Sequence, residues 1–287
     1  MTFRPSVAVI VPFAGSPEQL QDCVAALGRL TVAPGDELIV ADNRARPGAV
    51  PVGGAVRLMA AAGVRAAGFA RNRGAEAAAA EWLVFLDADT RPSPDLLTRY
   101  FDPPPVAGTA LLAGGIVDVA GRDSAAARRS VRRGQMSQRV TLQRTGRPYA
   151  QSANLAVRHC AFVAVGGFDE TARAGEDADL CWRLAAAGWG LQTRPEAVVE
   201  HLTRPTLGTL LVQLARHGSG AAWLDRRYPG EFPRAGPRGV SRGLAAAVAR
   251  IARRQPGAAV DALLAVAESC AFEVGRMLLS NRSRRMS

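Results

Sequence analysis

The sequence predicts an α/β fold, in which helices cover both faces of a mostly parallel sheet and a helical extension follows. Three continuous apolar runs, at residues 7–11, 38–41 and 82–86, are typical of strands buried on both faces. Segments with helical spacing separate these runs, as in parallel βαβ units. Asp42 and Asp87 each follow a run directly, and ligands of open α/β sheets bind beyond such strand ends.

The expected elements follow one another without an internal repeat. Ser16 has the residue type and position of an N-cap for the first helix. The expected elements are strands at 7–11, 37–41, 56–59, 82–86 and 111–119, and helices at 17–30, 69–80, 175–187, 207–228, 244–254 and 258–279. They predict a main α/β domain at residues 1–228, a helical extension at 229–280 and a disordered basic tail at 281–287.

Composition limits the partners and the compartment. The chain has 287 residues, and its 36 basic residues are all arginine, which gives a net charge of +11. This balance favours anionic partners: nucleotide phosphates, nucleic acid or an acidic membrane surface. The four cysteines of the chain are scattered and lack C-x-x-C spacing, which predicts reduced core thiols and a cytoplasmic protein. The N-terminus does not resemble a signal peptide, and no apolar run is long enough to span a bilayer.

Two acids, Asp87 and Asp89, stand one residue apart at the end of the run 82–86. Carboxylates at a strand end suit a hard divalent cation, Mg²⁺ or Mn²⁺, with phosphate oxygens completing its coordination. The alternative is that Asp89 caps the helical segment that starts near Asp95. Buried acids are costly without a cation, which favours the metal site.

Together, seven motifs in order resemble the family 2 glycosyltransferases, which are inverting enzymes with the GT-A fold and nucleotide-sugar donors. The resemblance covers about residues 6–225. Its motifs are VIVP at 9–12, DN at 42–43, ARNRG at 70–74, DAD at 87–89, NLAVR at 154–158, GGFDE at 166–170 and GEDADLCWR at 175–183. The resemblance implies sugar transfer to an acceptor hydroxyl, in cell-wall, polysaccharide or glycolipid biosynthesis.

The resemblance also implies roles for individual acids. Asp89 is the expected metal ligand, and Asp87 is expected to contact the ribose or support the ion. His201, after a short strand, is expected to supply a second metal ligand. Asp177 is the expected catalytic base, which removes the acceptor proton, with Glu176 and Asp179 as competitors. The alternative for this cluster is an acidic first turn that complements a helix dipole.

The nucleotide-sugar donor has its own expected contacts. Asp42 could accept the N3–H of uracil or thymine, which favours UDP or dTDP, or could form an Asx turn with Asn43. An arginine in the third motif could meet the diphosphate, and an asparagine beside it the nucleoside. The expected donor-binding residues are Pro12, Asp42, Arg71, Asn72, Asp87, Asn154 and Glu176.

The C-terminal part carries weaker signals. Arg216 and His217 lie where family members often carry a basic and aromatic cluster near the diphosphate. Two arginine clusters, within 128–133 and 250–254, could hold an anionic acceptor or dock the chain on the inner face of a membrane. Arginines on a solvated or self-packed surface are the plainer interpretation. The acceptor class, whether a glycan, a lipid-linked molecule or a small molecule, is not specified by these patterns.

Other functions remain as alternatives. A nucleotidyltransferase would also use acids and metal, but it usually has a Gly-rich basic loop after the first strand, which is missing here. A dinucleotide-dependent oxidoreductase would need G-x-G-x-x-G at that place. Nucleic-acid binding would explain the charge but not the acids at successive element ends, so no nucleic-acid partner is expected. A catalytically degenerate nucleotide-binding relative is the last alternative.

Overall fold

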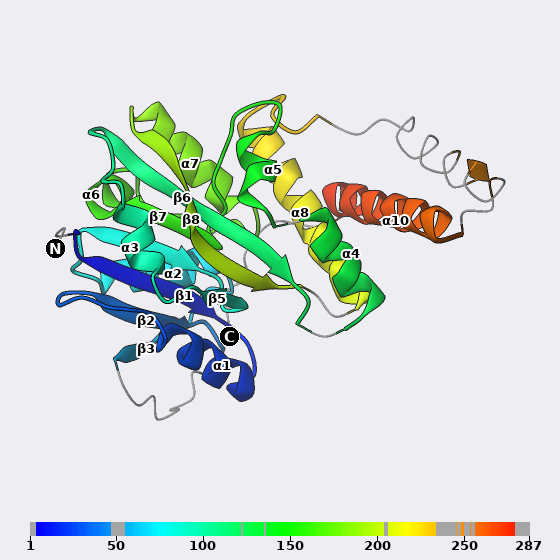
Figure 1. Cartoon of the computed structure of the whole chain (residues 1–287). Coiled ribbons are helices and arrows are strands. Elements are labelled where there is room, and N and C mark those ends of the chain that lie inside the picture. The colour runs from blue at the N-terminus through cyan, green and yellow to red at the C-terminus, as the bar shows by residue number, and fades with distance from the viewer. Residues whose placement is uncertain are drawn as a thin grey trace.

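The computed structural model describes residues 4–46, 55–121, 123–134, 136–203, 206–233, 245, 248–249, 253 and 256–278. Its strands are β1 (Val7–Phe13), β2 (Glu37–Asp42), β3 (Val56–Ala60), β4 (Trp82–Leu86), β5 (Thr90–Pro92), β6 (Thr109–Val119), β7 (Asn154–Arg158) and β8 (Gly190–Leu202). Its helices are α1 (Pro17–Leu27), α2 (Ala67–Glu76), α3 (Leu96–Phe101), α4 (Ala125–Arg133), α5 (Gln138–Leu142), α6 (His159–Ala164), α7 (Glu176–Ala186), α8 (Leu207–Arg227) and α10 (Pro256–Leu278). Figure 1 shows a central twisted sheet with helices around it.

The sheet joins a parallel half to a mixed half. Its strand order is β3-β2-β1-β4-β7-β6-β8-β5. The first four strands pair in parallel, as the apolar runs predicted. β7 is antiparallel to both of its neighbours, and the short β5 is antiparallel to β8, pairings that the sequence pattern did not predict. Because β5 pairs with β8, the turn that follows β4 lies beside the end of β8, where Thr90 is registered with His201.

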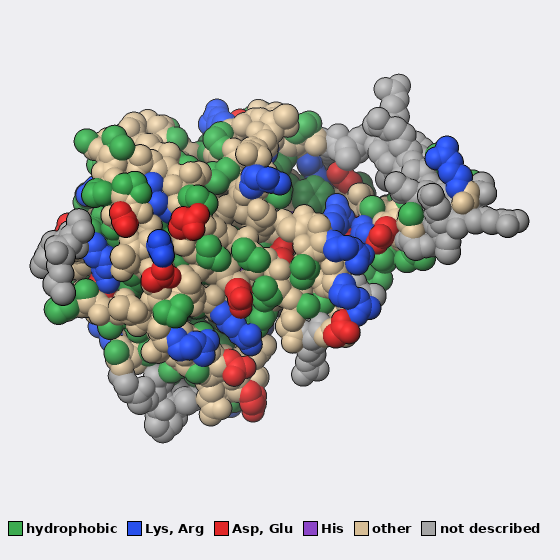
Figure 2. Space-filling view, viewed as in Figure 1, with side chains coloured by type: hydrophobic (Ala, Val, Ile, Leu, Met, Phe, Trp, Pro, Cys, Tyr) green, Lys and Arg blue, Asp and Glu red, His purple; other side chains and the backbone are tan. Residues whose placement is uncertain are grey.

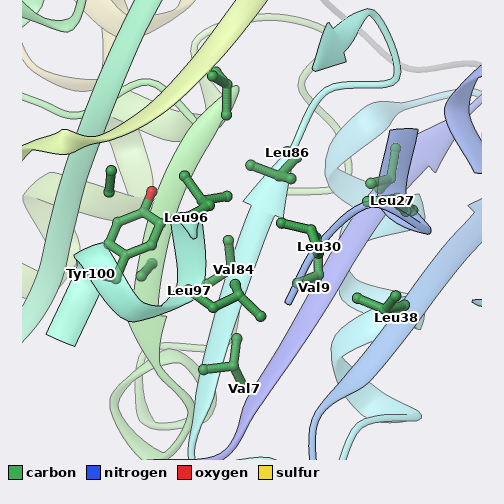
Figure 3. Close-up of a cluster of buried hydrophobic side chains, with 14 of the residues drawn as sticks. Val7, Val9, Leu27, Leu30, Leu38, Val84, Leu86, Leu96, Leu97 and Tyr100 are labelled. Carbon is green, nitrogen blue, oxygen red and sulfur yellow. The ribbon is translucent and has the colours of Figure 1, made fainter. Parts of the chain in front are cut away.

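Helices cover both faces of the sheet, as expected. Alternate strand residues point to opposite faces, so each face has its own core. On one face, Val84 belongs to the same cluster as Leu27 of α1 (Figure 3). On the other face, the Phe85 ring lies 5.4 Å from that of Phe162 in α6 and 5.0 Å from that of Phe168 before α7. Burying such aromatic side chains is a main source of stability.

Local sequence explains how the helices near the site begin and pack. Ser16 caps α1 as predicted, because its hydroxyl accepts from the Gln19 backbone and the Gln19 side chain accepts from the Ser16 backbone. In α2, a Cβ at Gly74 would lie 2.5 Å from Cγ2 of Ile10, so only glycine lets this helix lie so close to β1. This close packing positions the remaining α2 side chains over the strand ends.

The C-terminal helix α10 packs along α8 (Figure 1). A Cβ at Gly275 would lie 1.9 Å from the Ala215 carbonyl oxygen, and a Cβ at Gly218 would lie 1.9 Å from that of Phe272. These two glycines therefore allow a close crossing of the two backbones. The predicted tail at 281–287 and most of the helix expected at 244–254 lie outside the described residues.

The arginines of α4 bind acids of α10. Arg129 donates to Glu268 at 2.7 Å and to Asp261 at 2.8 Å, and Arg133 also contacts Glu268. Figure 2 shows basic and acidic side chains side by side over this part of the surface. The self-packed interpretation of this cluster is therefore the one that these contacts support. Within the described part of the chain, no helix is long and apolar enough to cross a membrane.

The cysteine prediction holds only in part. All four cysteines are free thiols, as expected. Cys23 and Cys181 are buried, and burial raises the pKa of each thiol to about 12. Cys160 and Cys270 are exposed instead of buried. Cys160 lies on the outer face of the short helix α6, and Cys270 on the outer face of α10.

Candidate functional site

The carboxyl end of β4 carries Asp87 and Asp89 in a tight turn. The main-chain oxygen of Asp87 accepts from the amide and the hydroxyl of Thr90, which closes this turn. Both acids keep partly exposed side chains, 31% for Asp87 and 28% for Asp89. The helix-cap alternative for Asp89 is wrong, because α3 begins at Leu96 with Asp95 in the N-cap position.

Arg71 of α2 joins this strand end to the N-terminus of α7. Its side chain is almost fully buried and donates to Asp87 at 2.7 Å and to Glu176 at 3.0 Å. Burial acts to lower the pKa of Arg71, but the charges of Asp87, Glu176 and Asp177 raise it above its ordinary value. The guanidinium therefore remains charged, and it holds two acids that lie 89 positions apart in the sequence on one side of the site.

Three acids occupy the first turn of α7, and the structure separates their roles. Asp179 is fully buried and accepts from Arg183 at 2.8 Å and from the Tyr228 hydroxyl at 2.8 Å, so it ties α7 to the end of α8. Glu176 is held by Arg71. Asp177 accepts from the backbone amide of Ala178 at 2.8 Å. Among the described residues, no side chain holds Asp177 through a hydrogen bond as Arg71 holds Glu176.

The acidity of Asp177 is strongly perturbed by its surroundings. Burial raises the pKa of Asp177 to about 7, with the nearby charge of Glu176 as the next cause. Backbone hydrogen bonds from Ala178 and Ser152 and the charge of Arg71 oppose this rise. A carboxylate that titrates near neutral pH in a site is well matched to proton removal.

His201 lies at the end of β8, facing Asp89. Its side chain is 4% exposed, with Nε2 3.7 Å from Oδ1 of Asp89 and Nδ1 2.9 Å from Oδ1 of Asp118. Burial acts to lower the pKa of His201, but the hydrogen bond to Asp118 and the charge of Asp89 raise it overall. The structure thus brings together the two expected metal-binding residues, and it adds Asp118, which the sequence analysis missed.

The side chains of Asp89 and His201 fit a divalent cation as ligands. A carboxylate and an imidazole nitrogen face one another at a separation too long for a hydrogen bond. Mg²⁺ and Mn²⁺ accept such ligands and take further oxygens from phosphate or water. Within the described residues, however, no group of three or more His, Cys, Asp or Glu side chains could hold an ion. The chain would therefore provide only part of a coordination sphere.

Asp42 lies fully buried at the end of β2, and its carboxylate is already engaged. Arg44 donates from Nε to Oδ1 at 2.8 Å and from a terminal nitrogen to Oδ2 at 2.7 Å. The Arg44 backbone amide also bonds Oδ1, which is the geometry of an Asx turn. Arg44 itself lies over the Phe13 ring, 5.5 Å from its centroid. A base that binds Asp42 must displace Arg44 or share the carboxylate with it.

The two expected asparagines are engaged with the protein. The Asn72 amide bonds both the amide and the carbonyl of Phe168, and it also donates to Glu170. Asn154 is fully buried and donates to the carbonyl oxygens of Gly115 and Ala197 while it accepts from Tyr100. These contacts give both asparagine side chains a structural role, which the sequence alone did not indicate. Their contacts with a nucleotide-sugar donor stay predictions.

Residues 166–170, one of the seven motifs, form a tight turn before α7. Gly166 and Gly167 both have positive φ, at 78° and 67°. A Cβ at Gly167 would lie 2.7 Å from Oδ1 of Asn72, so this position needs glycine on two grounds. The turn anchors the loop that leads to α7, and Asp169 accepts from Thr171 within it.

A pocket of about 240 Å³ opens at the carboxyl ends of β1, β2 and β4. Pro12 and Asp87 line it together with three exposed arginines. Its lining is Pro12, Phe13, Ala14, Asn43, Arg65, Ala66, Ala67, Asp87, Arg173 and Arg216. Arginines suit phosphate oxygens, so the pocket fits an anion such as a diphosphate. The sequence analysis pointed to Arg216, but it missed Arg65 and Arg173, which lie in loops without a local signal.

Three comparisons find known glycosyltransferases that are similar to this chain. Residues 5–220 match the family described as "Glycosyltransferase like family 2". A pre-mycofactocin glycosyltransferase of Mycobacterium tuberculosis is 37% identical over 169 residues, which are 56% of this chain and 35% of that protein. The matched segment thus spans about a third of the length of this curated relative.

A solved structure has a similar fold. It is the mannosyltransferase PcManGT of Pyrobaculum calidifontis in complex with GDP-Man and Mn²⁺, with a TM-score of 0.65 and 18% identity. The match covers 96% of this chain and 88% of the other. The expected GT-A fold is therefore confirmed. With the family match over residues 5–220, the chain belongs to the family 2-like glycosyltransferases.

Proposed function

We propose that this protein transfers a sugar, with inversion, from a nucleoside diphosphate donor to an acceptor hydroxyl. One observation carries the proposal: Arg71 holds Asp87 and Glu176 together, so that Asp177 lies next to the strand end that bears the donor pocket. Inversion by direct displacement needs a carboxylate base on the side opposite the leaving group. Asp177 is the acid of α7 best suited to that task, because Asp179 and Glu176 are held by other side chains.

In this proposal, Asp177 accepts the acceptor proton as the hydroxyl oxygen attacks the anomeric carbon. The bond from that carbon to the nucleoside diphosphate breaks, and the diphosphate takes the electron pair. Arg65, Arg173 and Arg216 would face the departing negative charge from the pocket wall. Arg71 keeps Asp87 and Glu176 in place through buried contacts.

Asp89 and His201 would hold a divalent cation, Mg²⁺ or Mn²⁺. Such an ion, when bound, neutralises charge on the leaving diphosphate as a Lewis acid. The solved mannosyltransferase of similar fold contains Mn²⁺, which supports a divalent ion as a candidate here. The contribution of the protein is to orient one carboxylate and one imidazole from two paired strand ends.

The proposed choice of donor nucleotide rests on Asp42. A free Asp42 carboxylate would accept the N3–H of uracil or thymine, so UDP and dTDP are the nucleotides expected from Asp42 alone. The solved structure of similar fold holds GDP-Man, so GDP sugars belong in any test panel. Pro12, Asn72 and Asn154 complete the donor-binding set that the resemblance implies.

The acceptor and the location are proposed more coarsely. A glycan, a lipid-linked molecule or a small molecule is compatible with the open pocket, and the named relative acts on pre-mycofactocin. We assign catalysis to residues 1–228, with 229–280 as a helical extension that supports α8. A cytoplasmic protein with peripheral contact to the inner face of a membrane would use the exposed arginines of α4, Arg128, Arg132 and Arg133.

A donor-binding and turnover experiment tests the proposal. UDP, dTDP and GDP, with and without their sugars, are screened by thermal shift with Mn²⁺ and with EDTA. A ligand at about 100 times its Kd should add roughly 2.7 kcal/mol to the free energy of unfolding. Donor consumption is then measured for the wild type, for Asp177→Asn and for the control Asp95→Asn, which changes a half-exposed acid at the N-cap position of α3.

The expected result is metal-dependent stabilisation by one nucleotide and donor consumption that Asp177→Asn abolishes and Asp95→Asn leaves intact. Metal-dependent binding without turnover of any donor would instead support a degenerate relative. Release of pyrophosphate from a nucleoside triphosphate would support the nucleotidyltransferase alternative.

A further inference from the structure

Asp118 is a buried acid that the proposed reaction leaves without a task. It lies near the end of β6 between two valines, and its side chain is 1% exposed. Burying a carboxylate is costly unless its oxygens are hydrogen-bonded. Both oxygens have partners here: Oδ1 faces Nδ1 of His201 at 2.9 Å, and Oδ2 accepts from the Met136 amide at 3.0 Å.

Strand pairing sets this contact. β6 and β8 run in parallel with Asp118 registered opposite His201, and β5 flanks His201 from the other side through Thr90. The His201 backbone is thus paired on both sides, and the residue is 3% exposed. The parallel register places the Asp118 carboxylate beside the imidazole ring, where it contacts Nδ1.

The two ring nitrogens then have different roles. A carboxylate accepts but does not donate, so Nδ1 must carry the proton in the hydrogen bond to Asp118. In the neutral ring the lone pair is therefore on Nε2, the atom that lies 3.7 Å from Oδ1 of Asp89. Carboxylate partners of this kind fix the tautomer of histidines that bind metal ions.

We propose that Asp118 is a positioning residue, which fixes neutral His201 in the Nδ1–H tautomer so that its Nε2 lone pair faces Asp89. The inference rests on the proposed function, because the use of that lone pair is to bind the divalent ion. Asp118 acts through His201 and touches neither substrate nor ion.

The hydrogen-bond pattern provides a sharp variant, Asp118→Asn. Both Asp118 oxygens accept from N–H groups, His201 Nδ1 on one side and the Met136 amide on the other. The asparagine side chain of this variant has only one acceptor oxygen, so its NH₂ group must face one of these two donors. If it faces His201, the ring must change to the Nε2–H tautomer, which removes the lone pair directed at Asp89.

The first readout is the tautomer, measured by long-range ¹H–¹⁵N NMR at a pH where the ring is neutral. The chain has only three histidines, so His201 can be assigned by comparison with His201→Asn. We expect the Nδ1–H pattern for His201 in the wild type. The Nε2–H pattern in the wild type would overturn the inference without any Asp118 variant.

The second readout is Mn²⁺ affinity in the presence of the best-binding nucleoside diphosphate, followed by electron paramagnetic resonance. Asp118→Asn should weaken Mn²⁺ binding about 10–100-fold. The control is Asp36→Asn, which also removes a buried carboxylate that accepts several N–H groups, but at the start of β2. Asp36→Asn should lower thermal stability and leave Mn²⁺ affinity unchanged.

The outcomes separate the inference from the proposed function. Equal Mn²⁺ affinity in wild type and in Asp118→Asn, although the His201 ring of that variant has changed to the Nε2–H tautomer, would overturn the role of Asp118. A wild type that binds no Mn²⁺ with any nucleotide would contradict the proposed metal site, while the wild-type tautomer would still decide whether Asp118 fixes the ring. If Asp118→Asn does not fold, the wild-type tautomer and Asp118→Glu, which keeps two acceptor oxygens, provide the test.

Discussion

Arg71 and Glu176 lie 105 positions apart in the sequence, yet a guanidinium nitrogen of Arg71 is 3.0 Å from Oε1 of Glu176 inside the protein. The same guanidinium contacts Asp87, so one buried cation joins α2, the end of β4 and the start of α7. This arrangement places the proposed base beside the proposed donor pocket. The predictions below follow from it and from the packing around it.

Removing Arg71 should destabilise the fold and abolish transfer. Arg71→Ala leaves Glu176 buried without its cation, and breaking a buried pair in this way costs about 3–5 kcal/mol. The control is Arg73→Ala on the same helix, whose ion pairs are with partly exposed acids and should contribute about 1 kcal/mol or less. Chemical denaturation and donor consumption check both variants. Equal stability loss in the two would contradict the bridging role of Arg71.

The pH dependence of transfer should report Asp177. Only the deprotonated carboxylate can accept a proton, so kcat/KM should rise about tenfold per pH unit below about 7 and level off above it. A rate profile with saturating Mn²⁺ measures this. A flat profile from pH 5.5 to 8.5 would contradict Asp177 as a base with a raised pKa.

Asp177 should also lower the stability of the protein at alkaline pH. Its pKa is raised in the folded state, from 3.8 to about 7, so the unfolded state loses this proton first as the pH rises. The acid therefore destabilises the fold increasingly from about pH 4 to pH 7. Asp177→Asn should raise Tm by a few degrees at pH 8 and by much less at pH 4, in contrast to a variant that merely disrupts packing.

The crossing of α8 and α10 should depend on its glycines. Gly275→Ala would place a Cβ 1.9 Å from the Ala215 carbonyl oxygen, so the helices must separate, at a cost of several kcal/mol. Gly208→Ala on α8 meets open space and should stabilise by up to about 1 kcal/mol. Thermal unfolding of the two variants tests this contrast, and a neutral Gly275→Ala would show that α10 does not pack closely on α8.

Arg44 should weaken recognition of uracil or thymine. Arg44→Ala frees both Asp42 oxygens from the contacts at 2.8 and 2.7 Å, so UDP or dTDP should bind more tightly. Asp42→Asn should weaken the same nucleotide. Calorimetric titrations of the two variants decide whether Asp42 reads the base, since unchanged affinity in both would exclude that role.

Much of the fold could be predicted from local patterns. The apolar runs of β1, β2 and β4 and the helices between them specify the parallel half, because strands buried on both faces are continuously apolar. The pairing directions in the mixed half were not predictable in this way. Periodicity does not encode the direction of pairing, and β5 has only three residues.

The site was predictable where residues follow strand ends. Asp89 and His201 were expected to bind the same metal ion, and Nε2 of His201 lies 3.7 Å from Oδ1 of Asp89. Asp118 was missed although an acid within an apolar strand was a usable signal. Arg65 and Arg173 had no signal, because loops distant in sequence bring them into the pocket. The contacts of Asn154 with backbone oxygens of two other segments could not be foreseen either.

The most direct test of inverting transfer needs no known acceptor. The wild type is incubated with UDP-, dTDP- and GDP-sugars and Mn²⁺, and the anomeric configuration of the first sugar released to water or acceptor is followed by ¹H NMR. We predict that one α-linked donor gives a β-configured product, and that Asp177→Asn abolishes its formation. A product with retained configuration, or equal release by Asp177→Asn, would contradict the account.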